Sequence, residues 1–184
     1  MDKQLAHYFE LLGRIAKDRV THFEGTVTNL TFDLYGCIQA AIQPKVDKDN
    51  KFPDGRWLDV HRLEPCGETR TMSVPVFSPD TPSIAILGRW GRDPVTNFEG
   101  TISSIAFLLS GKAEVTLSPR IDKDGKLPEG KWFDAKRVAL IGDQRSMMAP
   151  KFEQIQVPVI IPEHPRDHQH GPAEKPPVDQ GPRI

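Results

Sequence analysis

The sequence predicts an all-β protein that consists of two tandem, small antiparallel barrels of SH3-like type. Two observations carry this prediction. Residues 12–77 align with residues 87–152 at a constant offset of 75 positions without a gap, and 28 of the 66 paired positions are identical. Within each copy, short stretches rich in β-branched and aromatic residues alternate with turn signals about every ten residues. Two copies are too few for a solenoid, so each is interpreted as a small domain, with a β-sandwich as the alternative.

The chain divides into six segments on this basis. Apolar residues at helical spacing, Leu5, Tyr8 and Phe9 among them, predict a short helix before the first repeat. The C-terminal end is mostly Pro, His, Gly and charged residues, which bury too little apolar surface to form a core. The expected segments are an N-terminal helix at 1–11, repeat 1 at 12–77, a linker at 78–86, repeat 2 at 87–152, a final strand at 153–161 and an extended Pro-rich tail at 162–184.

Strand and turn signals recur at equivalent positions of the two repeats. The stretch 26–34 has an apolar side whose alternation breaks between Val27 and Leu30, which predicts a β-bulge. The pairs Asp49-Asn50 and Asp124-Gly125 are typical of tight hairpin turns. Each repeat ends in an extended segment that contains a proline and is therefore suited to a sheet edge. We expect these two segments, 67–77 and 142–152, to act as straps that cover a barrel, either their own or the neighbouring one.

Composition excludes several classes of protein. The chain has 184 residues, 38% hydrophobic content and a formal net charge of −1, which is typical of a soluble protein and argues against nucleic-acid binding through a basic face. Its two cysteines, Cys37 and Cys66, have no counterparts in repeat 2, so they do not form a disulfide framework and a reducing cytoplasm is expected. The N-terminus has no uninterrupted apolar core, which predicts neither a signal peptide nor a membrane span.

No motif for a catalytic, cofactor or metal site is found. Acidic residues at alternate positions, Asp47 with Asp49 and Asp122 with Asp124, resemble the start of a calcium loop. The remaining acidic ligands of such a loop are missing, so these residues are interpreted as hairpin turns. Neither a Ser/His/Asp nor a Cys/His arrangement in a family context is present. We therefore expect no enzyme activity, no cofactor and no metal.

Residues that are identical in both repeats are interpreted as structural anchors. Large aromatic residues at one position of two small domains usually belong to the core, so the two tryptophans of this set are expected to be buried. Asp59 with Arg62, and Asp134 with Arg137, are expected to form ion pairs beside them. The anchors are Phe23, Gly25, Trp57, Asp59, Phe98, Gly100, Trp132 and Asp134.

The largest difference between the repeats follows the glycine of the first turn. Repeat 1 has Tyr35, Cys37 and Gln39 where repeat 2 has Ser110, Lys112 and Glu114. If only one repeat binds a ligand or partner, this strand of repeat 1 is the candidate. The alternatives are ordinary drift after duplication and, for Cys37, the role of a small buried hydrophobic residue.

Several motifs of repeat 1 resemble a group of small, uncharacterised proteins encoded by tailed bacteriophages and prophages. The motifs are Val20-Thr-x-Phe-x-Gly-x-Val-Thr28, Tyr35-x-Gly-Cys-x-Gln39, Pro44 and Trp57-x-Asp59. The resemblance covers residues 12–64 and, more weakly, residues 87–139, where the Cys and Gln of the second motif are replaced. It implies a phage setting and supplies no activity.

Together these observations predict a non-catalytic bacteriophage protein that acts by binding. The preferred function is an accessory structural component of the virion, either a capsid decoration or a tail-associated protein, that is oligomeric in the assembly. Its partners would be other virion subunits, contacted through the tail at 162–184, with no nucleic acid and no membrane among them. The alternative is an intracellular phage protein that sequesters a host protein or a small molecule, for example against host defence. The expected location is accordingly the virion or the host cytoplasm.

Overall fold

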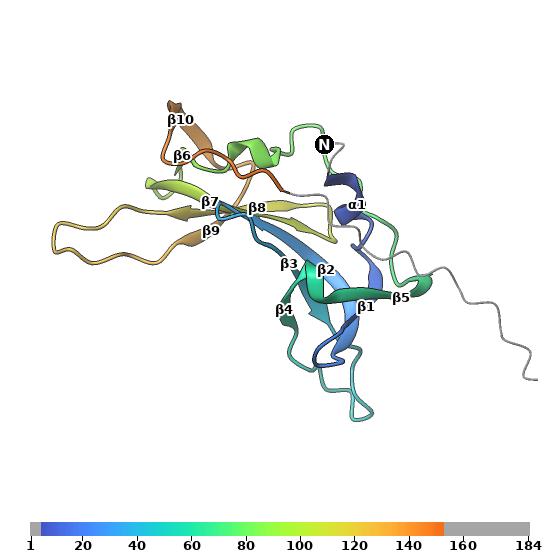
Figure 1. Cartoon of the computed structure of the whole chain (residues 1–184). Coiled ribbons are helices and arrows are strands. Elements are labelled where there is room, and N and C mark those ends of the chain that lie inside the picture. Colours follow the sequence, from blue (N-terminus) through green and yellow to red (C-terminus); the bar gives the residue numbers. More distant parts are fainter. Residues whose placement is uncertain (1–4, 153–184) are drawn as a thin grey trace, which may run out of the picture.

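The computed structural model describes residues 5–152 and confirms the all-β class (Figure 1). Repeat 1 contains five strands and a 3-10 turn, and repeat 2 contains five further strands. A short helix and a second 3-10 turn precede the two repeats. The elements are α1 (Ala6–Phe9), β1 (Arg14–Asp18), β2 (Glu24–Asp33), β3 (Ile38–Gln43), β4 (Arg56–Asp59), η2 (Val60–Arg62), β5 (Leu63–Arg70), η3 (Ile84–Ile86), β6 (Arg89–Asp93), β7 (Phe98–Leu108), β8 (Ala113–Ser118), β9 (Lys131–Asp134) and β10 (Ala139–Arg145).

The two repeats have the same strand order and the same register, including the fifth strand, where Arg14 lies opposite Arg70 and Arg89 lies opposite Arg145. In repeat 1 the order is β5-β1-β2-β3-β4, and in repeat 2 it is β10-β6-β7-β8-β9. Ile15 lies opposite Thr26, and the equivalent residue Trp90 lies opposite Thr101. The register of β2 against β3 shifts between Val27 and Asn29, and β7 shifts against β8 at the equivalent position. The predicted bulge is therefore confirmed and occurs in both repeats.

A direct pairing of β2 with β7 joins the repeats into one ten-stranded sheet. Residues 29–33 pair antiparallel with residues 104–108, and Thr31 lies opposite its own equivalent, Ala106. This pairing defines a pseudo-twofold axis between the repeats. The sheet is open, and closed barrels are not observed. The physical reason is that each long second strand has a free edge along its second half, and the same edge of the other repeat satisfies its backbone groups.

The first residues of the expected straps, 67–70 and 142–145, belong to strands β5 and β10 of their own repeats, and the remaining residues cross to the other repeat. Strap 1 (residues 73–77) ends in Phe77, whose ring centroid lies 5.4 Å from that of Phe107 in repeat 2. Strap 2 (residues 148–152) ends in Phe152, whose ring lies 5.2 Å from that of Phe32 in repeat 1. The straps therefore reach the neighbouring repeat, which is one of the two expected arrangements.

The described part of the predicted N-terminal helix ends earlier than expected. Among residues 5–11, Ala6–Phe9 are α-helical, and the chain then turns at Gly13 (φ 78°) to enter β1. Tyr8 and Phe9 are buried and pack on Phe32. The same turn precedes repeat 2, since Leu12 N donates to Phe9 O and the equivalent Leu87 N donates to Ile84 O. The expected final strand at 153–161 and the tail at 162–184 lie outside the described residues.

Candidate protein-binding surface

Two of the predicted anchors are glycines that the fold requires. A Cβ at Gly25 would lie 2.5 Å from the Gln43 carbonyl oxygen, and a Cβ at Gly100 would lie 2.6 Å from that of Ser118. These distances exclude any side chain, so the bulged strands approach their partners closely only with glycine at these positions. Phe23 and Phe98 are partly buried and pack against the core.

The prediction that the tryptophans are buried is wrong. Trp57 is 49% exposed and Trp132 is 48% exposed. Their strands β4 and β9 direct the following residues, Leu58 and Phe133, toward the core. Because successive side chains of a strand point to opposite faces, the tryptophans face away from the core. Asp59 and Asp134 are exposed as well.

The arginine ion pairs exist, but with other partners than predicted. Arg62 Nη2 lies 2.7 Å from Asp18 Oδ2, and Arg137 Nη2 lies 2.7 Å from Asp93 Oδ2. Both aspartates are 0% exposed, and each accepts a second side-chain hydrogen bond from a threonine of its own turn, Thr21 or Thr96. The two clusters are equivalent, and each joins the β1–β2 or β6–β7 turn to the segment that precedes the last strand.

These clusters predict a loss of stability in acid. The hydrogen bonds from Arg62 and Thr21 hold the pKa of Asp18 below its ordinary value. At Asp93, burial is the largest effect and raises the pKa, but the hydrogen bonds from Thr96 and Arg137 together outweigh it, so the pKa is lowered. A carboxylate with a depressed folded-state pKa stabilises the fold above its unfolded pKa of about 3.9 and loses this contribution as the pH falls further.

We therefore expect the urea midpoint of the protein to fall steeply below about pH 4. The double variant Asp18→Asn/Asp93→Asn should have a lower midpoint at pH 7 and a flatter dependence in acid. Asp54→Asn, at an exposed position, is the control and should behave as the wild type. The ion pairs would be shown to contribute nothing if the double variant kept the wild-type acid dependence.

The candidate strand of repeat 1 lies on an exposed turn. Tyr35 is 76% exposed, and Cys37 and Gln39 are exposed too. Asp33 Oδ1 accepts hydrogen bonds from the backbone N–H groups of Tyr35 and Cys37, at 2.8 and 3.0 Å. Repeat 2 has Leu108 at the position of Asp33, so this side-chain cap is specific to repeat 1.

Cys37 is not the small buried hydrophobic residue that the sequence offered as an alternative. It is exposed rather than buried, and the neighbouring Asp33 carboxylate raises the pKa of its thiol. A catalytic cysteine needs a lowered thiol pKa, because the thiolate is the nucleophile. The environment of Cys37 thus keeps the thiol protonated at neutral pH.

The Asp-x-Asp stretches form hairpin turns, as predicted. Asp47 Oδ1 accepts from Asp49 N and Lys51 N at 2.8 and 2.9 Å. Asp122 makes the same two bonds in repeat 2. One oxygen of each first aspartate is thereby engaged by the backbone of its own turn.

These turns lie in two closely similar hairpins, here named arm 1 (residues 44–57) and arm 2 (residues 119–132). Eight of the fourteen paired positions are identical, and the other six are the exchanges Lys/Arg, Val/Ile, Asn/Gly, Phe/Leu, Asp/Glu and Arg/Lys. The adjoining strands β3 and β8 share none of their six paired residues, although they form part of the core. Exposed hairpin loops ordinarily vary more than the strands that carry them. The arms show the reverse.

Each arm presents large apolar side chains to solvent at the same three positions. Phe52 is 81% exposed and its equivalent Leu127 is 75% exposed. The other positions hold Val46 (43%) or Ile121 (64%), and the two tryptophans. Exposed apolar residues that are grouped and rimmed by charges are typical of protein-interaction sites.

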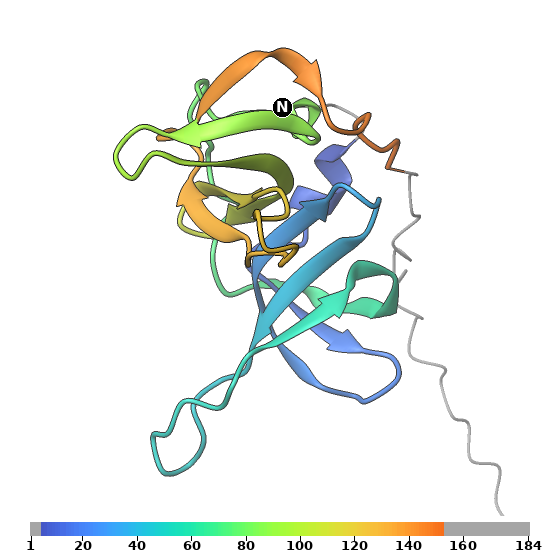
Figure 2. The same ribbon diagram turned by 90° about the vertical axis from the view of Figure 1, so that its left-hand side faces the viewer.

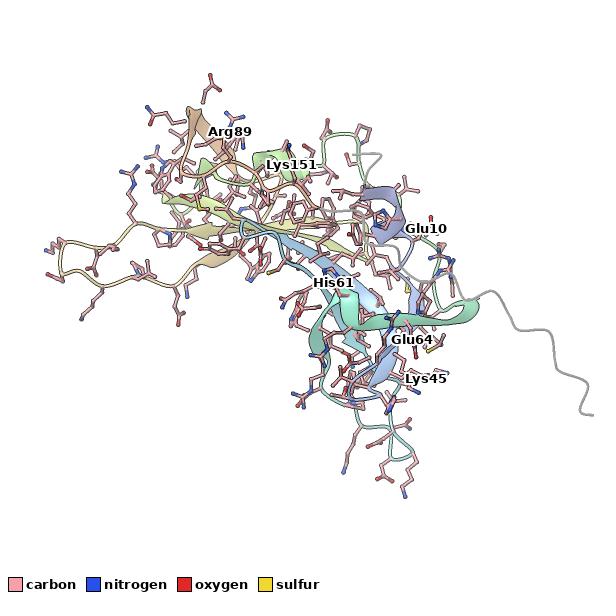
Figure 3. The ribbon with its side chains drawn as sticks, in the orientation of Figure 1. Glu10, Lys45, His61, Glu64, Arg89 and Lys151 are labelled. Atoms are coloured by element: carbon pink, nitrogen blue, oxygen red, sulfur yellow. The ribbon has the colours of Figure 1, made fainter. Side chains whose placement is uncertain are left out.

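The arms project from the sheet in different directions (Figures 1 and 2). Arm 2, coloured gold, extends to the left in Figure 1, and arm 1, coloured teal, extends downward. Figure 3 shows Lys45 on arm 1, well away from Glu10 beside α1, with the side chains of the arm directed outward. The pseudo-twofold relation between the repeats makes the arms two equivalent elements on one sheet.

Comparison of the chain with protein-family models, with curated proteins and with solved structures finds no match. In the described range, no helix is long and apolar enough to span a membrane. Within the same range, His, Cys, Asp and Glu form no group of three or more that could hold a metal ion.

Proposed function

We propose that this chain is a non-catalytic binding protein whose two arms engage a protein partner, and that it serves as an accessory component of a bacteriophage virion. The observation that carries the proposal is the similarity of arms 1 and 2, which exceeds that of the adjoining core strands β3 and β8. The geometry of the turns explains why both arms have an aspartate at the position of Asp47 and Asp122, since its carboxylate accepts hydrogen bonds from the backbone of the turn. It does not require an exposed Phe or Leu, nor the same sign of charge at every charged position.

We further propose that each repeat is an open, SH3-like half-barrel rather than a closed one. The strand order β5-β1-β2-β3-β4 supports this interpretation, as does the 3-10 turn between β4 and β5. The bulge in β2 lets one long strand pair with β1 along its first half and with β7 along its second half. Such a scaffold holds the arms apart without placing any residue of the arms in the core.

The symmetry of the arms indicates what kind of partner fits them. Two equivalent arms on a pseudo-twofold scaffold match a partner that presents the same site twice, as neighbouring copies of one subunit do. Binding through both arms at once raises the overall affinity about 10²–10⁴-fold above that of one arm. A virion is a lattice of identical subunits, and the resemblance of repeat 1 to small phage proteins supports this choice of partner.

The proposal is tested by the binding of purified protein to purified virions that were assembled without it. Pelleted protein is quantified by mass spectrometry. We expect the single variants Phe52→Ser and Leu127→Ser each to lose about 10²-fold or more in apparent affinity, because one arm no longer contributes. The double variant should not bind.

Val76→Ser is the matched control, since Val76 is apolar and 93% exposed but lies outside the arms. All variants should melt as the wild type does, because the replaced side chains are exposed. Wild-type protein that fails to pellet with virions would contradict the virion role. Undiminished binding by the double variant would contradict the role of the arms.

A further inference from the structure

We propose that residues 153–161 of this chain bind in an apolar groove of the same chain, between α1 and the segment that links the repeats. The groove has a volume of about 370 Å³ and is lined by Leu5, Phe9, Val76, Phe77, Ile84 and Phe107, among others. This volume is at the lower end of the range of about 300–1,000 Å³ found for ligand sites. It suits a few aliphatic side chains.

The sequence that follows repeat 2 contains the candidate occupant. The segments that lead into the repeats, residues 5–12 and 80–87, make equivalent turns and place Phe9 and Ile84 at the groove. Adding the same offset of 75 once more brings Val159 onto Ile84 and Ile161 onto Ile86. Only Ile161 is identical to its equivalent among residues 153–161, but Val159 and Ile161 are aliphatic as Ile84 and Ile86 are, and residues 162–184 do not continue the pattern of a repeat.

The pattern of side chains in residues 153–161 suits an extended peptide in a groove. Ile155, Val157, Val159 and Ile161 alternate with Gln156, Pro158 and Ile160. In an extended chain, alternate residues point to one side, so four aliphatic side chains share one face. The groove offers rings and aliphatic carbons to such a face, and burying it stabilises the bound state by removing apolar surface from water.

The place where the described chain ends favours binding within one molecule. The ring of Phe152 lies 5.2 Å from that of Phe32, which lies 5.9 Å from that of Phe107 in the groove. The rings of Phe152 and Phe107 are therefore at most about 11 Å apart, a straight distance that three or four extended residues span at about 3.3–3.6 Å each. Ile155 is the first aliphatic residue that reaches the groove. A link this short gives the segment a high effective concentration at its own groove.

The test measures the protection of a single cysteine in the full-length chain. Cys37→Ser/Cys66→Ser serves as background, and the new cysteine replaces Val157 or, as the unprotected reference, Asp179. Cysteine is a small hydrophobic residue and suits the position of Val157. We expect the cysteine at 157 to react with a thiol reagent at least about tenfold more slowly than that at 179, and independently of protein concentration. Val76→Asp, at an exposed position on the groove wall, should abolish the protection and lower the melting temperature by about as much as loss of the segment does.

Equal reaction rates at the two positions would overturn the proposal. Protection that grows with protein concentration would overturn binding within one molecule in favour of the groove of a neighbouring copy. Protection that survives Val76→Asp would show that the segment packs elsewhere. Truncations give an independent measure: a chain that ends at 161 should melt as the full chain does, and one that ends at 152 should melt several degrees lower. Equal melting of both truncations would also contradict the proposal.

Discussion

Expressed separately, neither repeat is expected to show a cooperative unfolding transition as a monomer. The pairing of residues 29–33 with residues 104–108 crosses the boundary between the repeats. The core crosses it as well, through the ring contacts Phe32–Phe107, Phe77–Phe107 and Phe152–Phe32. Domains of about 70–80 residues have little stability to lose. A separated repeat would expose both the long strand edge and the strap that belongs on its partner.

The measurement uses fragments 1–80 and 81–184, which are divided within the linker, with circular dichroism and gel filtration at several concentrations. Mixing the fragments should restore the transition of the intact chain. A fragment that folds only as a dimer would agree with the prediction, since a second copy can supply the equivalent strand edge across the same pseudo-twofold axis. A monomeric fragment with a sharp melting transition would contradict it. Intact protein cleaved in the linker after folding is the control and should stay folded.

The largest effect of a single substitution is expected at the aromatic residues where the repeats meet. Phe32 is 0% exposed and its ring contacts those of Tyr8, Phe9, Phe107 and Phe152. Phe32→Ala and Phe107→Ala should each lower the free energy of unfolding by about 3–5 kcal/mol, because both the buried surface and the packing around the cavity are lost. That is a large share of the stability of a small protein, about 5–15 kcal/mol.

Urea denaturation measures this loss, and the neighbouring turn supplies the control. Tyr35 is an aromatic residue three positions from Phe32 and is 76% exposed, so Tyr35→Ala should change the free energy of unfolding by no more than about 0.5 kcal/mol. The idea of one core shared by both repeats would fail if Phe32→Ala cost no more than Tyr35→Ala.

The tryptophans and arginines show the limit of reasoning from the sequence. The occurrence of Trp57 and Trp132 in both repeats predicts a place in the core, yet the structure shows them exposed beside Leu58 and Phe133. Proximity in the chain pairs Arg62 with Asp59, whereas the structure pairs it with Asp18, 44 residues away. Identity between the repeats indicates that a residue is retained for structure or for binding. It does not indicate on which face of the sheet the residue lies.

The sequence also lacks clear signals for β1, β5 and their equivalents. The stretch Arg14–Asp18 carries only Ile15 and Ala16 as apolar residues, which is too weak a pattern to indicate a strand. The exposed apolar residues of the arms do have a sequence signal, because the arms are more similar to each other than the adjoining strands are. Comparison of the two repeats thus distinguishes a retained surface from core strands whose residues have drifted.

The sequence by itself determined the tandem repeat, the all-β class, the bulge in the second strand and the hairpin turns of the arms. These features depend on residues close together in the chain, through side-chain alternation and turn chemistry. Only the tertiary structure decided that the repeats share one open sheet, that the straps cross between them and that the buried aspartates bind the distant arginines. Those outcomes depend on which free strand edges and apolar faces meet in space, and two repeats with the same pattern leave this pairing undetermined until the chain folds.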